Sequence, residues 1–481
     1  MTQADVIAIL PVAMVIGWAL VVLLADLWIP GERKGITAVL SAAGLAIALG
    51  VSISQSGRQM VAFNGMAIQD GFALFLDVLF LVCGLAGVAL AYDYLKRMGI
   101  ERGEYYVLLL FTISGMMLMG YAYDLIVVFV ALELLSIPLY ILSGFARPQP
   151  ESEESALKYF LLGAFAAGFV LYGVALIFGA TTHTDIKGIL AAISASTYNR
   201  PLFLAGASLL LVGLGFKVAL VPFHMWTPDV YQGAPSPVTG FMSIGAKAAG
   251  FAALLRVFIA VFPGINADMT PVLWVLAALT MILGNIVAVV QSNIKRLLAY
   301  SSIASAGYLL MAFVPYGKDS VQSDTIAAML FYLVGYAFTT LGAWAVVIAL
   351  EQAQGKGLDL NDYAGLGRKY PWLAVAMMVF MLSFTGIPLT LGFWGKFYLF
   401  RTAVEGGFIG LALIGLLTSL VSAYYYLRVV VIMFMRPGEP QVRNDPWLNL
   451  AAGVAAAAVL GLSFLPGSIL NMAADAVMRM Q

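Results

Sequence analysis

Residues 214–237 read LGFKVALVPFHMWTPDVYQGAPSP, a hydrophobic segment that carries a lysine and is then interrupted by four prolines. Residues 384–400, FTGIPLTLGFWGKFYLF, repeat the pattern, with Gly386 and Pro388 ahead of Lys396. Proline removes a backbone donor and leaves carbonyl groups unpaired. Inside a membrane, such a backbone is tolerated only where protein or water satisfies it. Two broken helices that carry lysines therefore predict a transport site within a membrane bundle.

The composition of the whole chain agrees with a membrane protein. Of 481 residues, 62% are hydrophobic and 10% are charged, which is too few charges to cover a soluble particle of this size. The net charge is zero, so nothing indicates nucleic-acid binding. Cys83 is the single cysteine, and His183 and His224 are the two histidines. This excludes an internal disulfide, a thiolate iron–sulfur cluster and a cysteine zinc site, so we expect no redox cofactor and no metal in this chain.

Fourteen hydrophobic segments are long enough to cross a bilayer core, which takes about 20 helical residues. Apolar and polar residues do not alternate within them, so we expect helices throughout a single all-α membrane domain over 1–481. The segments lie at approximately 5–27, 35–54, 72–94, 105–121, 123–145, 156–180, 203–222, 236–262, 271–290, 297–315, 325–350, 372–400, 408–434 and 447–471.

An even number of spans places both termini on one side of the membrane. With the N-terminus outside, thirteen basic residues fall in cytoplasmic loops and six in the outer loops and tail. Cytoplasmic loops carry the excess of lysine and arginine in membrane proteins. Both termini are therefore predicted on the outer side.

Four charged residues fall near the middle of predicted spans: Glu133, Lys217, Lys247 and Lys396. A central charge costs about 2.5–3.5 kcal/mol, so four cost on the order of 10 kcal/mol together. A buried lysine can gain and lose a proton near neutral pH, and a nearby carboxylate shifts that balance. A lateral proton path through the lysines is the functional interpretation, and an inert ion pair of Glu133 with Lys217 is the structural one.

Other charged residues allow two interpretations each. His224, just after the first break, could relay protons to Lys217 or bond a loop carbonyl. Lys158, at the start of its span, could join the relay or reach the surface. Arg256 and Arg428 lie towards span ends and are expected to extend their charges to the membrane surface. Asp77 is expected either at a lipid-shielded interface or beside a polar neighbour.

The two breaks lie in the seventh and twelfth spans, with Pro222 and Pro388 as the breaking residues. Broken helices in corresponding positions indicate a transporter built from inverted repeats. The spacing predicts two inverted five-helix repeats, 105–262 (spans 4–8) and 271–434 (spans 9–13). Three N-terminal helices within 1–104 precede them, and a C-terminal helix within 447–481 follows.

At these residues the sequence resembles the antiporter-like membrane subunits of respiratory complex I, which are related to subunits of multisubunit Na⁺/H⁺ antiporters. Within that family it looks most like the subunit N type, the bacterial counterpart of mitochondrial subunit 2, because it stops after fourteen spans and has lysine at Lys396. The similar stretches are ALELLSIPLYIL (131–142), GFKVALVPFHMWTPDVYQGAPSPVTGFMSIGAKAAGFAALLR (215–256), NIKRLLAYSSIASAGY (293–308), DLNDYAGLGRKYP (359–371) and LSFTGIPLTLGFWGKFYLF (382–400).

The resemblance implies a proton-translocating subunit of NADH:quinone oxidoreductase in the bacterial inner membrane. Glu133 and Lys217 would form its charge pair, Lys247 the central relay and Lys396 the terminal lysine near the outward exit. It also implies that NAD, FMN, iron–sulfur clusters and quinone belong to partner subunits. The antiporter-like subunit M and the small subunit K are the expected neighbours, with lipid around them.

Three other functions remain open on the sequence alone. A subunit of a Na⁺/H⁺ antiporter would exchange ions without redox chemistry. A structural spacer would contain inert salt bridges. A secondary transporter would need a polar pocket for a solute, and none besides the lysines is visible in the sequence.

Overall fold

The computed structural model describes residues 2–318, 321–352, 355–443 and 445–478, with the backbone alone for 259–264 and 478. The described residues are almost entirely helical. The long helices are α2 (Leu10–Asp26), α3 (Gly35–Ser54), α4 (Gly71–Arg97), α5 (Glu104–Tyr121), α6 (Leu125–Ser143), α7 (Pro150–Thr181), α9 (Arg200–Val218), α11 (Ser236–Val289), α12 (Ile294–Phe313), α13 (Gln322–Leu350), α15 (Pro371–Thr385), α16 (Leu391–Glu405), α17 (Ile409–Met435) and α18 (Pro446–Gly461).

The prediction of an all-α membrane protein is confirmed. Within the described ranges, twelve helical segments are long and apolar enough to cross a membrane, and α11 contains two of them, Ser236–Phe258 and Ile265–Val289. Two shorter apolar helices, Leu10–Asp26 and Pro371–Thr385, complete a set that matches the fourteen predicted spans one to one. The twelfth span is interrupted as expected, because α15 ends and α16 begins on either side of 386–390.

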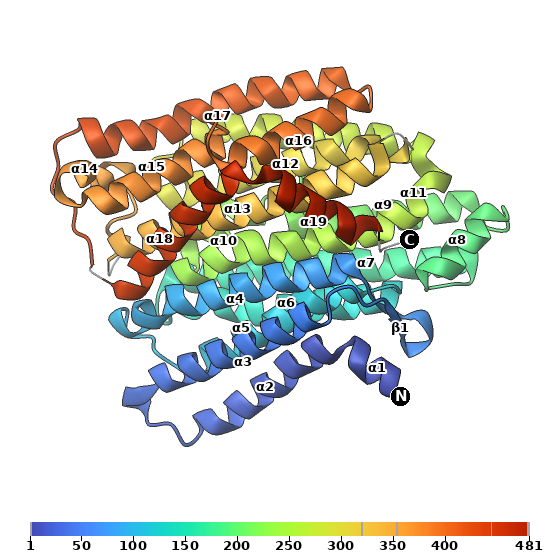
Figure 1. Cartoon of the computed structure of the whole chain (residues 1–481), viewed down its shortest axis with the longest axis horizontal. Helices are drawn as coiled ribbons and strands as arrows, with labels where there is room; N and C mark the ends of the chain where they lie inside the picture. The colour runs from blue at the N-terminus through green and yellow to red at the C-terminus, as the bar shows by residue number, and fades with distance from the viewer. Residues whose placement is uncertain (1, 319–320, 353–354, 444, 479–481) are drawn as a thin grey trace.

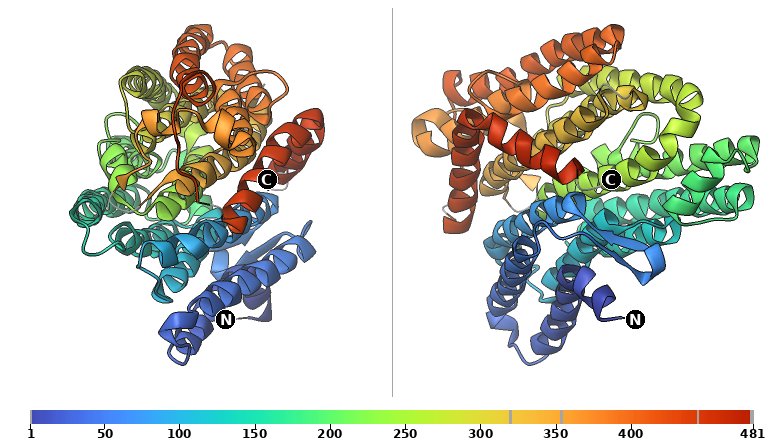
Figure 2. Two further views of the ribbon diagram at one scale, coloured as in Figure 1. Left: turned by 90° about the vertical axis from the view of Figure 1, so that its left-hand side faces the viewer. Right: turned by 45° about the vertical axis from the view of Figure 1, so that its right-hand side comes forward.

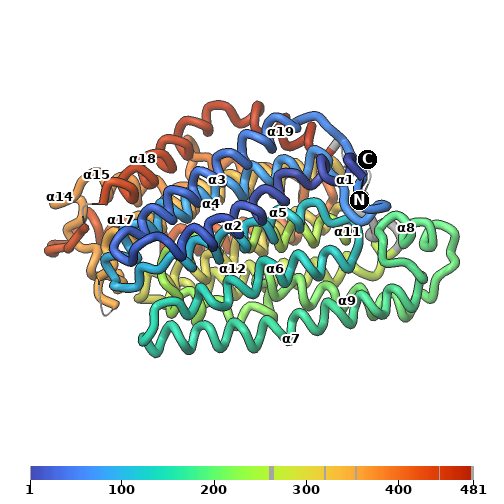
Figure 3. Tube along the Cα trace, turned by 90° about the horizontal axis from the view of Figure 1, so that it is seen from below, coloured from blue at the N-terminus to red at the C-terminus, as the bar shows by residue number. Residues whose placement is uncertain are grey.

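The long helices lie side by side along the longest axis of the molecule (Figure 1). Viewed along that axis, the blue N-terminal helices form one edge of the bundle and the orange α17 the opposite edge (Figure 2). Both chain ends lie at the same end of the bundle, together with α8 (Figures 1 and 3). This agrees with an even number of crossings.

Short elements join or flank the long helices. They are α1 (Gln3–Ala8), the antiparallel pair β1 (Met60–Ala62) and β2 (Ala67–Gln69), α8 (Ile186–Ser194), α10 (Trp226–Gly233), α14 (Leu366–Lys369) and α19 (Pro466–Met478). The last predicted span, 447–471, is too long. The helix α18 stops at Gly461, and α19 starts anew at Pro466 and packs against α13 and α4.

Acidic or amide side chains define where several helices begin. Asp124 accepts a hydrogen bond from the Ile126 backbone N–H at 2.7 Å, and Asn293 accepts from Lys295 N–H at 2.9 Å. Such N-caps satisfy backbone donors that the first turn leaves unpaired. They fix the start of α6 and of α12, and therefore the depth of the residues that follow on each helix.

Matched backbone hydrogen bonds tie down these two capped starts. Leu125 N–H donates to the Thr184 carbonyl at 3.0 Å, and Ile186 N–H donates to the Tyr123 carbonyl at 3.1 Å. The second tie has the same form. Ile294 N–H donates to Leu358 at 2.9 Å, and Leu360 N–H donates to Ser292 at 2.8 Å. The first tie lies beside α8, and the second lies at the opposite end of the bundle, where α7 begins.

Candidate functional site

Lys217 lies in the last turn of α9 and is 4% exposed. Its Nζ donates to Ser136 Oγ at 2.9 Å and to the Tyr159 hydroxyl at 3.1 Å, and lies 5.4 Å from the centre of the Tyr159 ring. The helices α7 and α9 pack closely, since a Cβ on Gly173 would lie 2.8 Å from the Gly206 carbonyl oxygen. This close packing places Lys217 of α9 beside Tyr159 of α7. The ammonium is therefore held by neutral oxygens and an aromatic face.

Glu133 lies on α6, one helical turn before Ser136, and is half-buried. It interacts electrostatically with Lys217. Among the described residues, however, no ion pair within 4.0 Å joins the two side chains, and Glu133 Oε1 is buried without a hydrogen-bond partner. Glu133 and Lys217 are therefore neighbours but do not form an ion pair. Ser136 and Tyr159 accept the hydrogen bonds of the lysine instead.

The break after Lys217 differs in detail from the predicted one. The helix α9 ends at Val218, where Ala219 adopts a left-handed conformation with φ 62°, and Pro222 lies beyond it in the loop. The Trp226 indole N–H donates to the Phe216 carbonyl at 2.9 Å, and Thr280 Oγ1 accepts from Val221 N–H at 3.0 Å. Side chains from elsewhere thus satisfy the backbone groups that the break releases.

Lys247 lies on α11, 3% exposed, between α12 and α13. Its Nζ donates to the carbonyl of Ser302 and to Ser302 Oγ, the latter at 2.5 Å, and lies 5.7 Å from the Tyr336 ring centre. No carboxylate pairs with it among the residues that the structure describes. The stem of Lys217 packs next to Gly250, one turn further along the same helix, where an added Cβ would lie 3.3 Å from Lys217 Cγ. The first two lysines are therefore neighbours across the contact between α9 and α11.

Lys396 lies on α16 and uses the second break directly. Its Nζ donates to the carbonyl of Thr385, the last residue of α15, at 3.0 Å, and to Ser419 Oγ at 2.8 Å. The Tyr308 ring centre lies 5.0 Å away. The break therefore supplies the lysine with an acceptor, because a carbonyl at a helix end has no intrahelical partner.

A run of hydroxyl groups lies between Lys247 and Lys396 on α12 and α17. Ser301, beside Ser302, shares a hydrogen bond of 2.5 Å with the Tyr426 hydroxyl. Further along α12, the Tyr308 hydroxyl accepts from Asn285 at 3.1 Å, and its ring faces Lys396. These groups are buried, and each hydroxyl can accept one hydrogen bond while donating another. The arrangement is suited to moving protons sideways through the bundle.

The two further relay candidates lie outside this buried line. Lys158 is 40% exposed and pairs with Glu154 at 2.6 Å and Asp229 at 2.7 Å. Burial raises the pKa of Asp229, but its pairs with Lys158 and Arg296 outweigh burial and hold that pKa below the ordinary value. His224 is half-buried in the α9–α10 loop, where its ring bonds the Pro222 carbonyl. Its Nδ1 is buried with no partner in the described part of the chain.

Arg256 does not reach the membrane surface, so that expectation is wrong. It is 2% exposed and forms a bidentate pair with Asp70, both bonds being 2.6 Å, while Nε donates to the Gly120 carbonyl at 2.9 Å. Arg428 is half-buried and caps the end of α11 by donating to the Val289 carbonyl at 2.9 Å. Asp77 is buried beside a polar neighbour, since the Tyr121 hydroxyl donates to it at 2.7 Å.

Sequence reasoning missed several buried charges, among them Lys295 and Glu351. Lys295 is one of the thirteen basic residues predicted in cytoplasmic loops, but it is 2% exposed and donates to the Ala234 carbonyl at 2.7 Å. Glu351, at the end of α13, is 5% exposed. Both lie at the ends of hydrophobic segments, where a charged residue normally reaches water. Both residues lie within two positions of a predicted span end, and nothing in the sequence indicates that they are buried.

Comparisons with known proteins identify the family of this chain. Residues 122–422 match the family model described as NADH:quinone oxidoreductase/Mrp antiporter, transmembrane. NADH-quinone oxidoreductase subunit N 2 of Roseiflexus castenholzii is 46% identical over 467 residues, which cover 96% of this chain and 94% of the relative.

Solved structures show the same similarity. A chain of respiratory complex I from Thermus thermophilus with bound aureothin is 39% identical, with a TM-score of 0.83, covering 96% of this chain and 99% of that one. A chain of the Mrp complex from Dietzia sp. DQ12-45-1b has a TM-score of 0.85 at 21% identity, covering 99% of this chain and 97% of that chain. The second likeness establishes a shared fold alone.

Proposed function

This chain belongs to the NADH:quinone oxidoreductase/Mrp antiporter transmembrane family and, within it, to the subunit N proteins of NADH-quinone oxidoreductase, and from that premise we propose a path for its protons. It is an antiporter-like, proton-translocating membrane subunit of respiratory complex I. We place electron transfer, with NAD, FMN, iron–sulfur clusters and quinone, in partner subunits. The buried thiol of Cys83 stands alone and could not hold a cluster.

The proposed path runs through Glu133, Lys217, Lys247 and Lys396. One observation carries it: each lysine is buried and bonded to hydroxyl or carbonyl oxygens instead of carboxylates. A neutral oxygen can accept a hydrogen bond from an ammonium or from a neutral amine, so these surroundings suit both protonation states. A carboxylate would favour the ammonium alone. Glu133, near but not bonded to Lys217, supplies a negative charge whose approach can hold the proton there.

An arginine test separates this path from inert salt bridges. Arginine keeps a positive charge but effectively never releases its proton. We expect Lys247→Arg and Lys396→Arg to lower proton uptake into sealed vesicles per NADH oxidised by about a hundredfold, the lower end of the range for loss of a proton-transfer group. Electron transfer to an artificial acceptor, measured in parallel, should remain and so report assembly. Full pumping by both variants would contradict the path.

Two secondary relays complete the proposal. His224, with a free buried nitrogen in the α9–α10 loop, would pass protons between that loop and Lys217. Lys158 would act at the surface, where its side chain is 40% exposed and its Nζ donates to Glu154 and Asp229.

We also propose that 105–262 and 271–434 are inverted repeats. The matched backbone ties support this, because they flank the second helix of each repeat and lie at opposite ends of the bundle. In the membrane, this subunit would lie beside the antiporter-like subunit M and the small subunit K. Both termini would face the outer side of the bacterial inner membrane, as the excess of basic residues in the opposite loops indicates.

A Na⁺/H⁺ antiporter subunit is the second candidate. The shared fold with the Mrp chain favours it, but at 21% identity that likeness carries no function. The 46% identity with subunit N over almost the whole chain favours the complex I assignment.

A further inference from the structure

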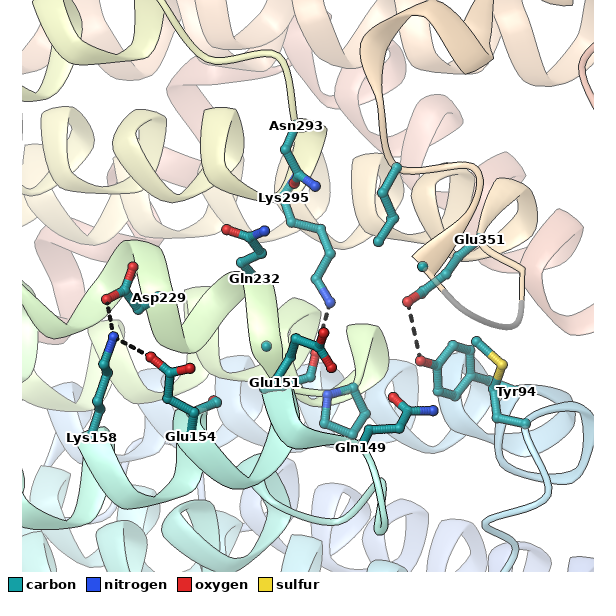
Figure 4. A pocket seen from close by; sticks show the side chains of 17 residues that line it. Tyr94, Gln149, Glu151, Glu154, Lys158, Asp229, Gln232, Asn293, Lys295 and Glu351 are labelled. Atoms are coloured by element: carbon teal, nitrogen blue, oxygen red, sulfur yellow. Dashed lines mark hydrogen bonds and ion pairs between the residues drawn. The ribbon is translucent and has the colours of Figure 1, made fainter.

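A polar cavity of about 590 Å³ lies among the ends of α4, α7, α10, α12 and α13 (Figure 4). It lies at the end of the bundle opposite the termini, where the excess of basic loop residues predicts the cytoplasm. Four carboxylates line it: Glu151, Glu154, Asp229 and Glu351. The first two are exposed and the third is partly exposed, whereas Glu351 is buried.

Glu351 has one satisfied and one unsatisfied oxygen. Its Oε1 accepts from the Tyr94 hydroxyl at 3.3 Å, and its Oε2 is buried with no hydrogen-bond partner within the described ranges. A buried polar atom without a protein partner normally binds water or takes part in chemistry. Since Glu351 also lines the cavity, this carboxylate lies next to a space large enough for water.

The charged and titratable groups that face Glu351 come from three elements. They are Tyr94 and Arg97 on α4, Lys295 on α12 and Tyr363 on the 3₁₀ turn Leu360–Tyr363. Neither cation forms an ion pair with Glu351 among the described residues. Lys295 donates to the Ala234 carbonyl, and Arg97 donates to the Ile348 carbonyl at 2.8 Å. If Glu351 served only to neutralise a nearby cation, it would be expected to form an ion pair with Lys295 or Arg97.

A line of polar residues runs from this carboxylate towards Lys247, although the Thr239 and Ser243 hydroxyls donate to backbone carbonyls in this structure. The Tyr94 hydroxyl also interacts with the Ser236 backbone N–H, at the start of α11. From there, Ser236, Thr239, Ser243 and Lys247 follow at steps of three or four residues, which places them on one face of the helix. All four are buried, and Ser236 Oγ has no partner in the described part of the chain. The line is about 16 Å long at 1.5 Å per residue.

We propose that Glu351 is the proton-uptake carboxylate of this subunit, taking protons from the cavity and delivering them along the polar face of α11 to Lys247. The inference rests on the proposed role of Lys247 and adds the group that loads it. A proton from cavity water binds the Glu351 carboxylate and leaves it for the first hydroxyl or bridging water. Each following hydroxyl, joined to the next by a bridging water, accepts one proton as it releases its own, and the neutral Lys247 amine accepts the last.

The test compares carboxyl and amide at one position. In the assembled complex, Glu351→Gln keeps an acceptor for Tyr94 but cannot carry a proton, so NADH:quinone turnover and proton uptake should fall about three- to tenfold. This is less than the full effect of losing a proton-transfer group, because water supplies part of the flux. Glu351→Asp should restore most of the rate. Added imidazole or formate, small enough for the cavity, should partly restore turnover by Glu351→Gln in detergent.

Glu151→Gln is the matched control, since it removes a carboxylate from the same cavity wall at an exposed position. It should change turnover less than twofold, and the artificial-acceptor activity should be unchanged in every variant. If Glu351→Gln does not assemble, Ser243→Ala tests the same line and should lower turnover without affecting assembly.

Equal turnover of Glu351→Gln and Glu151→Gln would overturn the proposal. So would a loss that neither aspartate nor small buffers relieve, because that pattern indicates a structural role. An assembled Ser243→Ala variant with full turnover would overturn the route. If Lys247→Arg is impaired while Glu351→Gln is normal, the lysine path stands and only the uptake assignment fails.

Discussion

At the scale of single residues, Arg256 and the three lysines of the proposed path have different hydrogen-bond partners. Arg256 is paired bidentately with Asp70, and both side chains are completely enclosed. The three lysines are bonded to neutral oxygens and lie over tyrosine rings, which attract a cation by about 0.5–2 kcal/mol. The permanent charge of Arg256 is matched by a counter-charge, whereas the lysines of the proposed path are not.

The Arg256 pair should therefore matter for stability and not for proton transfer. Arg256→Met leaves the Asp70 carboxylate buried and unpaired, which costs about 3–5 kcal/mol. We expect the assembled complex to dissociate at a lower temperature, while preparations kept cold pump normally per NADH oxidised. Adding Asp70→Asn should recover part of the lost stability. A variant that pumps poorly while melting normally would contradict this division of roles.

The sequence revealed the lysines but not this pair. A lysine in the middle of a hydrophobic segment is conspicuous by itself, since its depth follows from counting residues. Arg256 lies nearer a span end, and its partner is 186 residues away in the chain. Long-range pairing depends on which helices pack together, which no local pattern specifies. Glu351 and Lys295 were missed for the same reason.

At the scale of elements, the sequence predicts that two helices are interrupted, but it does not predict the residue at which the first of them ends. Proline and glycine mark the interruption of 384–400, and α15 does end at Thr385. In the first break the chain turns at Ala219, a residue that gives no turn signal, so the helix ends before Pro222. The turn is held by side chains from other helices, such as Trp226 and Thr280.

The glycine at the second break is required on two grounds. Gly386 has φ 88°, which costs an L-residue about 1–2 kcal/mol, and a Cβ there would lie 3.0 Å from Lys396 Cδ. We expect Gly386→Ala to displace the Lys396 stem and lower proton uptake per NADH severalfold. Gly99→Ala is the control, because Gly99 has φ 69° but nothing within 4 Å of an added Cβ. Equal pumping by the two variants would show that the position of the lysine tolerates the change.

At the scale of the whole molecule, fourteen apolar helices were predictable because bilayer thickness sets their length. The side of the membrane on which the ends lie is a separate prediction. A C-terminal reporter that is active only in the cytoplasm should stay silent in the assembled complex. The same reporter inserted in the 98–103 loop, at the other end of the bundle, should be active. A strong signal from the C-terminal fusion would reverse the orientation.

The matched backbone ties have a consequence for the direction of transport. A scaffold made of two identical halves in opposite orientations would move protons equally well in either direction across the membrane. A preferred direction of proton movement must then come from positions where the two halves differ. Glu133 lies nine residues after the cap Asp124, and Ser302 lies nine residues after the cap Asn293. One half thus has a titratable acid where the other has a hydroxyl bonded to Lys247. A difference of this kind would give proton movement through the subunit a direction.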